Sequence, residues 1–165
     1  MRDQLLDDIL TLARHKGWRL ATAESCTGGM VAAALTRRAG SSDVFDCGFV
    51  TYSNQAKQSS LGVNPETLST FGAVSEEVAR EMAAGALLHS TADLSVAITG
   101  IAGPGGSEHK PEGRVCFALA GPKLTSETVE FGALGRENVR NFARDHALTM
   151  LLDSLHKSSG QPLSQ

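Results

Sequence analysis

Apolar residues recur at helical spacing in several stretches of the chain. Leu5, Ile9, Leu12 and Ala13 share one face of a predicted N-terminal helix, which Gly17 ends. Apolar periodicity and capping residues predict further helices at 30–38, at 54–61, from Asn64-Pro65 onward, from Ser75 onward and at 136–156. The side chains of six residues in the last helix are expected to face the core: Val139, Phe142, Ala143, Ala147, Met150 and Leu151.

Other stretches are dense in β-branched and apolar residues, which favours strands at 18–23, 44–53, 94–101, 114–120 and 124–131. The run at 94–101 is almost continuously apolar, as expected for a central strand covered on both faces. The last two strands flank Gly121-Pro122 and predict an antiparallel hairpin. Alternation of strands and helices predicts an α/β fold, a three-layer α/β/α sandwich with a mixed, mostly parallel sheet of about five strands.

A chain of 165 residues suits one domain, which we place at 1–157, followed by a flexible polar tail at 158–165. The net charge of −3 and the scattered Lys and Arg residues argue against a nucleic-acid partner. No apolar run approaches the roughly 20 residues of a membrane span, and the N-terminus does not resemble a signal peptide. Three widely spaced cysteines fit reduced thiols, so we expect a cytoplasmic protein.

Small polar residues gather where three predicted strands end, at 22–29, 51–57 and 97–106. Ligands of open α/β sheets bind at the carboxyl ends of the strands, so these segments are expected to converge on one site. Thr27, Gly28 and Gly29 open a predicted helix, whose backbone N–H groups favour an anion such as a phosphate. The alternative reading is a tight turn that simply requires glycine.

Ser25 is the candidate nucleophile in this region, and it needs a base to remove its proton. The five histidines lie on predicted helix faces or in a loop, which leaves Lys57, near Tyr52, as the base. A lysine withdrawn from water beside a cationic ligand can lose its proton, although most lysines are simply solvated. Cys26 is a competing nucleophile, because a helix N-terminus stabilises thiolates.

A metal centre is not expected. Glu24 and Asp46 lack histidines or further acids at ligand spacing.

Four motifs carry a resemblance to a known family: TAESCTGG at 22–29, GFVTYSNQAK at 48–57, GAVSEEV at 72–78 and SVAITGIAGPGG at 95–106. The chain resembles the CinA C-terminal domain family from its first helix to its last. Enzymatic members of that family are nicotinamide mononucleotide deamidases. The resemblance implies hydrolysis of the carboxamide to nicotinate mononucleotide and ammonia, in the recycling of NAD. It implies no cofactor, a small-molecule substrate and a homo-oligomer, with a dimer favoured.

The resemblance also implies site residues. The family's Ser–Lys pair corresponds to Ser25 and Lys57. We choose Arg140 as the arginine that the family's last helix contributes, with Arg136 and Arg144 as alternatives. The expected substrate-binding set is Thr27, Gly28, Gly29, Ser42, Tyr52, Thr99, Gly100 and Arg140.

Two other functions stay open. One is a metal-dependent nucleotide phosphohydrolase, since phosphoryl chemistry leans on metal ions. The other is a non-catalytic nucleotide-binding module linked to competence or DNA damage, as the family's historical name implies. In the deamidase reading, the glycine-rich loop at 102–113 is expected to close over the ligand as a lid.

Overall fold

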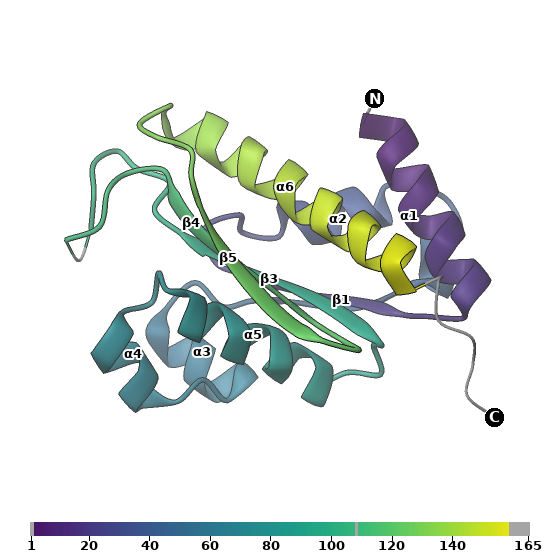
Figure 1. Cartoon of the computed structure of the whole chain (residues 1–165), viewed down its shortest axis with the longest axis horizontal. Coiled ribbons are helices and arrows are strands. Elements are labelled where there is room, and N and C mark those ends of the chain that lie inside the picture. The colour runs from purple at the N-terminus through teal and green to yellow at the C-terminus, as the bar shows by residue number, and fades with distance from the viewer. Residues whose placement is uncertain (1, 108, 159–165) are drawn as a thin grey trace.

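The computed structural model describes residues 2–107 and 109–158 and contains a five-stranded sheet with helices on both faces (Figure 1). This arrangement confirms the predicted three-layer α/β/α sandwich. The helices are α1 (Arg2–Lys16), α2 (Met30–Thr36), α3 (Asn54–Leu61), α4 (Pro65–Phe71), α5 (Glu76–Leu88) and α6 (Arg136–Lys157), with a 3₁₀ turn at Ser41–Asp43. The strands are β1 (Leu20–Glu24), β2 (Phe45–Val50), β3 (Leu94–Gly100), β4 (Arg114–Ala120) and β5 (Leu124–Glu130).

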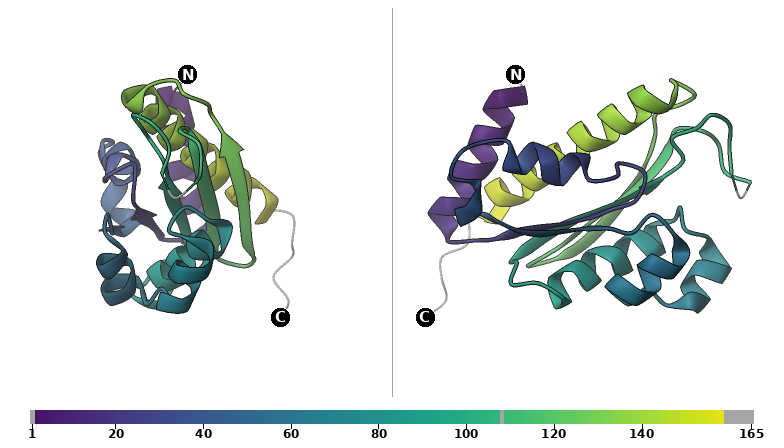
Figure 2. Two further views of the ribbon diagram at one scale, coloured as in Figure 1. Left: turned by 90° about the vertical axis from the view of Figure 1, so that its left-hand side faces the viewer. Right: turned by 180° about the vertical axis from the view of Figure 1, so that it is seen from behind.

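The helices divide between the two faces of the sheet. Helices α1, α2 and α6 cover one face, and α3, α4 and α5 cover the other (Figures 1 and 2). Each face has its own apolar cluster: Leu20, Val96 and Phe117 point into the first, and Ala21, Ala97 and Ala118 point into the second. Because side chains alternate along a strand, consecutive residues of one strand serve opposite cores. This explains why β1, β3 and β4 are buried along almost their whole length.

The strand order is β2-β1-β3-β4-β5. β1 pairs in parallel with both β2 and β3, whereas β4 is antiparallel to β3 and to β5. The chain leaves β1 toward β2 on one side and later returns as β3 on the other. This reversal of direction opens a crevice at the carboxyl end of β1, which is where open α/β sheets bind ligands.

Several details differ from the prediction. β2 ends at Val50 because Ser53 is already the N-cap of α3, where its hydroxyl accepts from the Ala56 amide. Phe142, expected inside, is 48% exposed and stacks against Phe131 on the surface. Ser158, expected in the tail, caps α6 and donates to the Ser154 carbonyl. The remaining tail residues, 159–165, lie outside the described residues.

Among residues 2–107 and 109–158, no helix combines the length and apolar character that crossing a membrane requires.

Candidate active site

A cavity of about 360 Å³ lies at the carboxyl ends of the three parallel strands. The volume falls within the range of about 300–1,000 Å³ that is usual for small-ligand sites. Its lining comes from the segments after β1, β2 and β3, from the α4–α5 turn and from the start of α6: Ser25, Cys26, Tyr52, Asn54, Lys57, Ala73, Val74, the run 99–107 and Arg136. The predicted convergence of the three small-polar segments is therefore what the structure shows.

Ser25 and Lys57 meet inside this cavity. Lys57 Nζ lies 3.1 Å from Ser25 Oγ and donates to the Thr51 carbonyl at 2.7 Å. The lysine is 1% exposed and the serine 9% exposed, so little water reaches either side chain. The Ser25 amide donates to the Ile98 carbonyl of β3, which holds the serine beside the central strand. An amine and a hydroxyl at this distance can exchange a proton.

Local structure explains how the lysine reaches the serine. Lys57 stands in the first turn of α3, whose start is set by the Ser53 cap. Helical side chains lean toward the N-terminus of their helix, so the Lys57 chain runs back toward the end of β2. That direction brings its amine to the Thr51 carbonyl and to Ser25.

Cys26 is a buried thiol without thiolate character. It is 5% exposed, and burial raises the pKa of its thiol to about 12. The expected stabilisation by a helix N-terminus is wrong, because α2 begins only at Met30. Removal from water therefore dominates, and the thiol stays protonated at physiological pH.

The anion site expected at the start of α2 is already occupied by the protein's own carboxylate. Glu24 is wholly buried, and its two oxygens accept from the Val31 amide at 2.9 Å and the Ala32 amide at 3.0 Å. A carboxylate there satisfies unpaired donors and the helix dipole. The Val31 and Ala32 amides are therefore not available to a phosphate, and phosphate binding at the 27–29 turn stays a prediction.

Thr27, Gly28 and Gly29 build the turn instead of lining the cavity. Gly28 has a φ of 57° and Gly29 a φ of 99°, a left-handed conformation that glycine adopts without strain. The Gly28 amide donates to the Ser25 carbonyl, and Thr27 is fully buried. The alternative reading from the sequence, a tight turn that needs glycine, describes these residues correctly.

Tyr52, Thr99 and Gly100 do line the cavity, as expected. Tyr52 is 60% exposed at the mouth, whereas Thr99 is buried and donates to the Ala73 carbonyl at 2.8 Å. Ser42 lies elsewhere, because its 3₁₀ turn precedes the amino end of β2 and the cavity is at the carboxyl end. Within one chain Ser42 therefore does not join the site.

The arginine that lines the cavity is Arg136, one of the two alternatives to our choice of Arg140. Arg136 donates to the Tyr52 hydroxyl at 2.7 Å and to the Gly103 carbonyl at 2.8 Å. Arg140, one helical turn later, donates to the Cys26 carbonyl and supports the turn after Ser25 from outside the cavity. Arg144 bonds to Asp145 and Asn141 on its own helix.

Sequence reasoning missed the contribution of Asn54, Ala73 and Val74 to the cavity. The signal was present for all three, since Asn54 belongs to the GFVTYSNQAK motif and Ala73 and Val74 belong to the GAVSEEV motif. Only the tertiary structure shows that the loop between α4 and α5 faces the end of β3.

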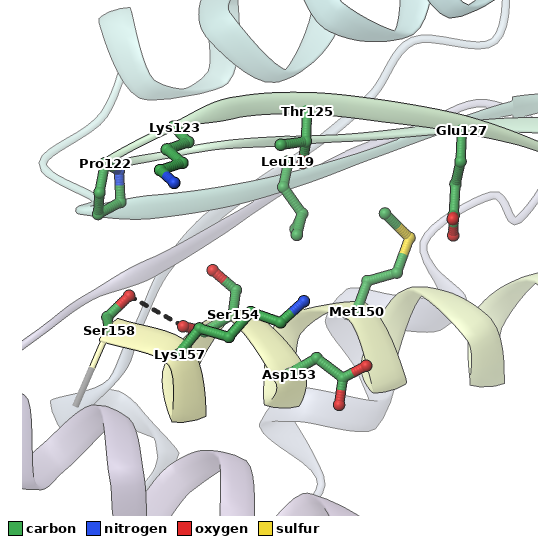
Figure 3. A pocket seen from close by; sticks show the side chains of 10 residues that line it. All are labelled: Leu119, Pro122, Lys123, Thr125, Glu127, Met150, Asp153, Ser154, Lys157 and Ser158. Atoms are coloured by element: carbon green, nitrogen blue, oxygen red, sulfur yellow. Dashed lines mark hydrogen bonds between the residues drawn. The ribbon is translucent and has the colours of Figure 1, made fainter. Parts of the chain in front are cut away.

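A second cavity of about 420 Å³ lies between the β4–β5 turn and the end of α6 (Figure 3). Leu119 of β4 and Met150 of α6 line it from opposite sides, together with Lys123, Asp153 and Lys157. It contains no pairing of a nucleophile with a base. The contact between Ser25 and Lys57 therefore favours the cavity of about 360 Å³ as the functional site, although it is the smaller of the two.

Within residues 2–107 and 109–158, no group of three or more His, Cys, Asp or Glu side chains is arranged to hold a metal ion.

A sequence model of the CinA C-terminal domain matches residues 2–155. This chain belongs to the CinA C-terminal domain family. A family member from Enterobacter agglomerans, the nicotinamide-nucleotide amidohydrolase PncC, is 54% identical over 119 residues, which are 72% of this chain and 73% of that protein. A CinA-like protein of Syntrophobacter fumaroxidans is 52% identical over 152 residues, 90% of this chain but 36% of that protein. The chain thus spans about a third of the length of such relatives.

Solved structures of the family share the fold. A CinA superfamily protein from Klebsiella pneumoniae 700603 superposes with a TM-score of 0.91 at 38% identity, covering 95% of this chain and 99% of that one. A competence/damage inducible protein from Agrobacterium tumefaciens has a TM-score of 0.81 at 48% identity, covering 90% of this chain and 96% of that one.

Proposed function

We propose that this chain is an amidohydrolase that converts nicotinamide mononucleotide to nicotinate mononucleotide and ammonia, with Ser25 as nucleophile and Lys57 as base. The observation that carries the proposal is the buried contact of 3.1 Å between Lys57 Nζ and Ser25 Oγ. The name of the Enterobacter agglomerans relative, a nicotinamide-nucleotide amidohydrolase, supplies the substrate.

In the proposed acylation step, neutral Lys57 accepts the proton of the Ser25 hydroxyl as Oγ bonds to the carboxamide carbon. The tetrahedral intermediate then collapses, the carbon–nitrogen bond breaks, and the Lys57 ammonium gives its proton to the departing amide nitrogen. Ammonia leaves and an ester joins the nicotinoyl group to Ser25.

In the proposed deacylation step, Lys57 takes a proton from a water molecule as its oxygen attacks the ester carbon. The Ser25 oxygen leaves and recovers a proton from Lys57, which releases the product as a carboxylic acid that then loses its proton to water. The pyridinium ring of the substrate makes the carboxamide more electrophilic and opposes protonation of Lys57. Substrate binding therefore favours the form of the lysine that acts as base.

We place the phosphate of the nucleotide near Arg136 at the mouth of the cavity. Two observations support this position: the Glu24 carboxylate occupies the start of α2, and Arg136 and Lys57 are the two cationic side chains in the described lining. Because Lys57 is buried beside the nucleophile, the reacting carboxamide belongs at the deep end. The phosphate then lies toward the exposed guanidinium, which suits phosphate oxygens.

The first experiment incubates chelator-treated protein with nicotinamide mononucleotide and measures ammonia and nicotinate mononucleotide together. Equal amounts of both products, unaffected by the chelator, are expected. Loss of activity that magnesium restores would favour a metal-dependent phosphohydrolase instead. Binding of the nucleotide without any product would favour a non-catalytic module.

A second experiment tests the two residues directly. Ser25→Ala is expected to abolish turnover, and Lys57→Met to lower kcat by roughly 10²- to 10⁴-fold, the usual contribution of a general base. Ser60→Ala, on the exposed side of α3, and Lys123→Met, in the β4–β5 turn, are the matched controls. Full activity of Ser25→Ala in a folded protein would disprove the nucleophile.

A further inference from the structure

Lys110 joins two segments that are far apart in the sequence. Its ammonium donates to the carbonyls of Phe71 and Val74, each at 2.5 Å. Phe71 is the last residue of α4, whose carbonyl has no partner within the helix, and a cation suits the negative end of the helix dipole. The α4–α5 turn is thus fastened to the loop that follows β3.

The remaining carbonyls of this turn are held as well. The Gly72 carbonyl accepts from Ser75 Oγ at 2.9 Å, and the Ala73 carbonyl accepts from Thr99 Oγ1 at 2.8 Å. Four successive carbonyl groups therefore have donors, two of them supplied by one lysine. Backbone carbonyls withdrawn from water need hydrogen-bond donors, and the Lys110 ammonium supplies two of the four in this turn. The Lys110 side chain therefore helps to set the shape of the turn.

The backbone of Lys110 shapes the opposite segment. Its amide donates to the Ser107 carbonyl at 2.8 Å, and its carbonyl accepts from the Ser107 amide at 3.0 Å. Gly106 packs so closely that a Cβ there would come within 2.4 Å of the Lys110 carbonyl oxygen. Ser107 and Lys110 therefore form an antiparallel bridge, against which Gly106 packs.

Both segments are walls of the catalytic cavity. Gly106 and Ser107 line it from one segment, and Ala73 and Val74 line it from the other. Lys110 itself does not line this cavity. One residue thus connects the two walls through its backbone on one side and its ammonium on the other.

We propose that Lys110 is a positioning residue that sets the separation of these two walls and thereby the fit of the nucleotide. The loop after Gly103 then serves as a fixed wall instead of the swinging lid that its glycine content suggests. This inference rests on the proposed function only for the identity of the ligand. The hydrogen bonds that Lys110 makes to both walls belong to the fold and do not depend on the ligand.

Steady-state kinetics with nicotinamide mononucleotide give the first test. Lys110→Gln is neutral and too short to reach both carbonyls, so KM is expected to rise about 10-fold, the effect of one lost charge-assisted hydrogen bond. The change in kcat is expected to stay within about threefold, because Ser25 and Lys57 are untouched. Lys110→Arg, which keeps the charge and the donors, is expected to recover most of the affinity.

Hydrogen exchange gives a test that does not depend on turnover. In Lys110→Gln the amides of 72–75 and of 103–107 are expected to exchange at least about 10-fold faster, and to do so together, because one tie holds both. Lys123→Gln is the matched control, since Lys123 lies in the β4–β5 turn and does not line this cavity. If Lys110→Gln fails to fold, Lys110→Arg is compared with wild type by the same measurement.

In the exchange measurement, two results would overturn the proposal: exchange no faster than in Lys123→Gln, or faster exchange in one wall alone. A larger effect on kcat than on KM would also overturn it. If the wild-type protein releases no ammonia from nicotinamide mononucleotide, the proposed function fails, and the exchange comparison still decides the role of Lys110.

Discussion

At the scale of single residues, the candidate site depends on how little water reaches it. Ser25 and Lys57 are almost fully buried, so in the proposed mechanism the proton passes between them and the bound substrate rather than to bulk solvent. Burial also affects the neighbouring Cys26, because it raises the pKa of this thiol and so keeps it protonated. Of the two neighbouring residues, Ser25 with its Lys57 contact is therefore better suited to act as a nucleophile than the protonated thiol of Cys26.

The thiol of Cys26 is expected to be chemically silent. Its pKa, raised to about 12 by burial, leaves it protonated below that pH, so iodoacetamide at pH 8 should not label it in the folded protein. Peptide mapping by mass spectrometry checks this, with unfolded protein as the positive control. Cys26→Ala is expected to keep kcat within about threefold of wild type. Rapid labelling at pH 8 with loss of activity would instead make Cys26 a functional thiol.

Arg136 is expected to discriminate between substrates with and without a phosphate. Arg136→Met should lower kcat/KM for nicotinamide mononucleotide roughly 10- to 100-fold, because a charge-assisted contact is lost. For the corresponding nucleoside, which lacks the phosphate, the change should stay within about threefold. Arg37→Met, on the exposed surface near α1, is the control. Equal losses for both substrates would show that Arg136 acts only through its bonds to Tyr52 and Gly103.

At the scale of elements, the turn after β1 is held by two helices. Glu24 binds the first amides of α2, and Arg140 of α6 donates to the Cys26 carbonyl. The turn that carries Ser25 is therefore fixed from both ends by charged groups. These residues support the geometry of Ser25 without lining the cavity themselves.

Glu24→Gln is expected to destabilise the fold through α2. The Gln side chain has one oxygen that can accept from one backbone amide, but its NH₂ group faces the other backbone N–H. One charge-assisted hydrogen bond is therefore lost, and two N–H groups with like partial charges face each other at the start of the helix. The free energy of unfolding should fall by about 1–3 kcal/mol. Urea titration followed by circular dichroism measures this. Glu137→Gln, in the exposed first turn of α6, is the control and should change stability little. An unchanged midpoint for Glu24→Gln would contradict the capping role.

At the scale of the whole molecule, the parallel strands place the site and join the two cores. β1 and β3 lie side by side at the centre of the sheet, so Ser25 after β1 and Thr99 at the end of β3 meet in the same crevice. The same strands send alternate side chains into both apolar clusters. The two apolar clusters are therefore separate, and the same three strands contribute side chains to both. The homo-oligomer, with a dimer favoured, stays a prediction.

The shared strands predict a single unfolding transition. Trp18 packs against the cluster beneath α1, α2 and α6, whereas circular dichroism reports the helices of both layers. Urea midpoints from Trp18 fluorescence and from circular dichroism are expected to coincide, as in two-state unfolding of a small domain. Two separated midpoints would show that the layer of α3, α4 and α5 unfolds independently.

The sequence by itself determined the elements and much of the site. Apolar periodicity, the Ser53 and Ser75 caps and the continuous apolar run at 94–100 are local signals, so the fold class was predictable from them. The positions of Ser25, Lys57 and Tyr52 in the cavity were predictable because each stands at the end of a predicted strand or just beyond it, whereas Thr99 was expected from the family resemblance.

Only the tertiary structure decided which charged groups meet. The Glu24 carboxylate excludes an external anion from α2 because β1 runs into the turn before that helix. Arg136 reaches the cavity and Arg140 does not, because successive turns of α6 pass different segments of the chain. Ser42 is separated from the site by the direction of β2, and Lys110 is brought to it across the α4–α5 turn. These contacts join residues distant in the sequence, so no local pattern encodes them.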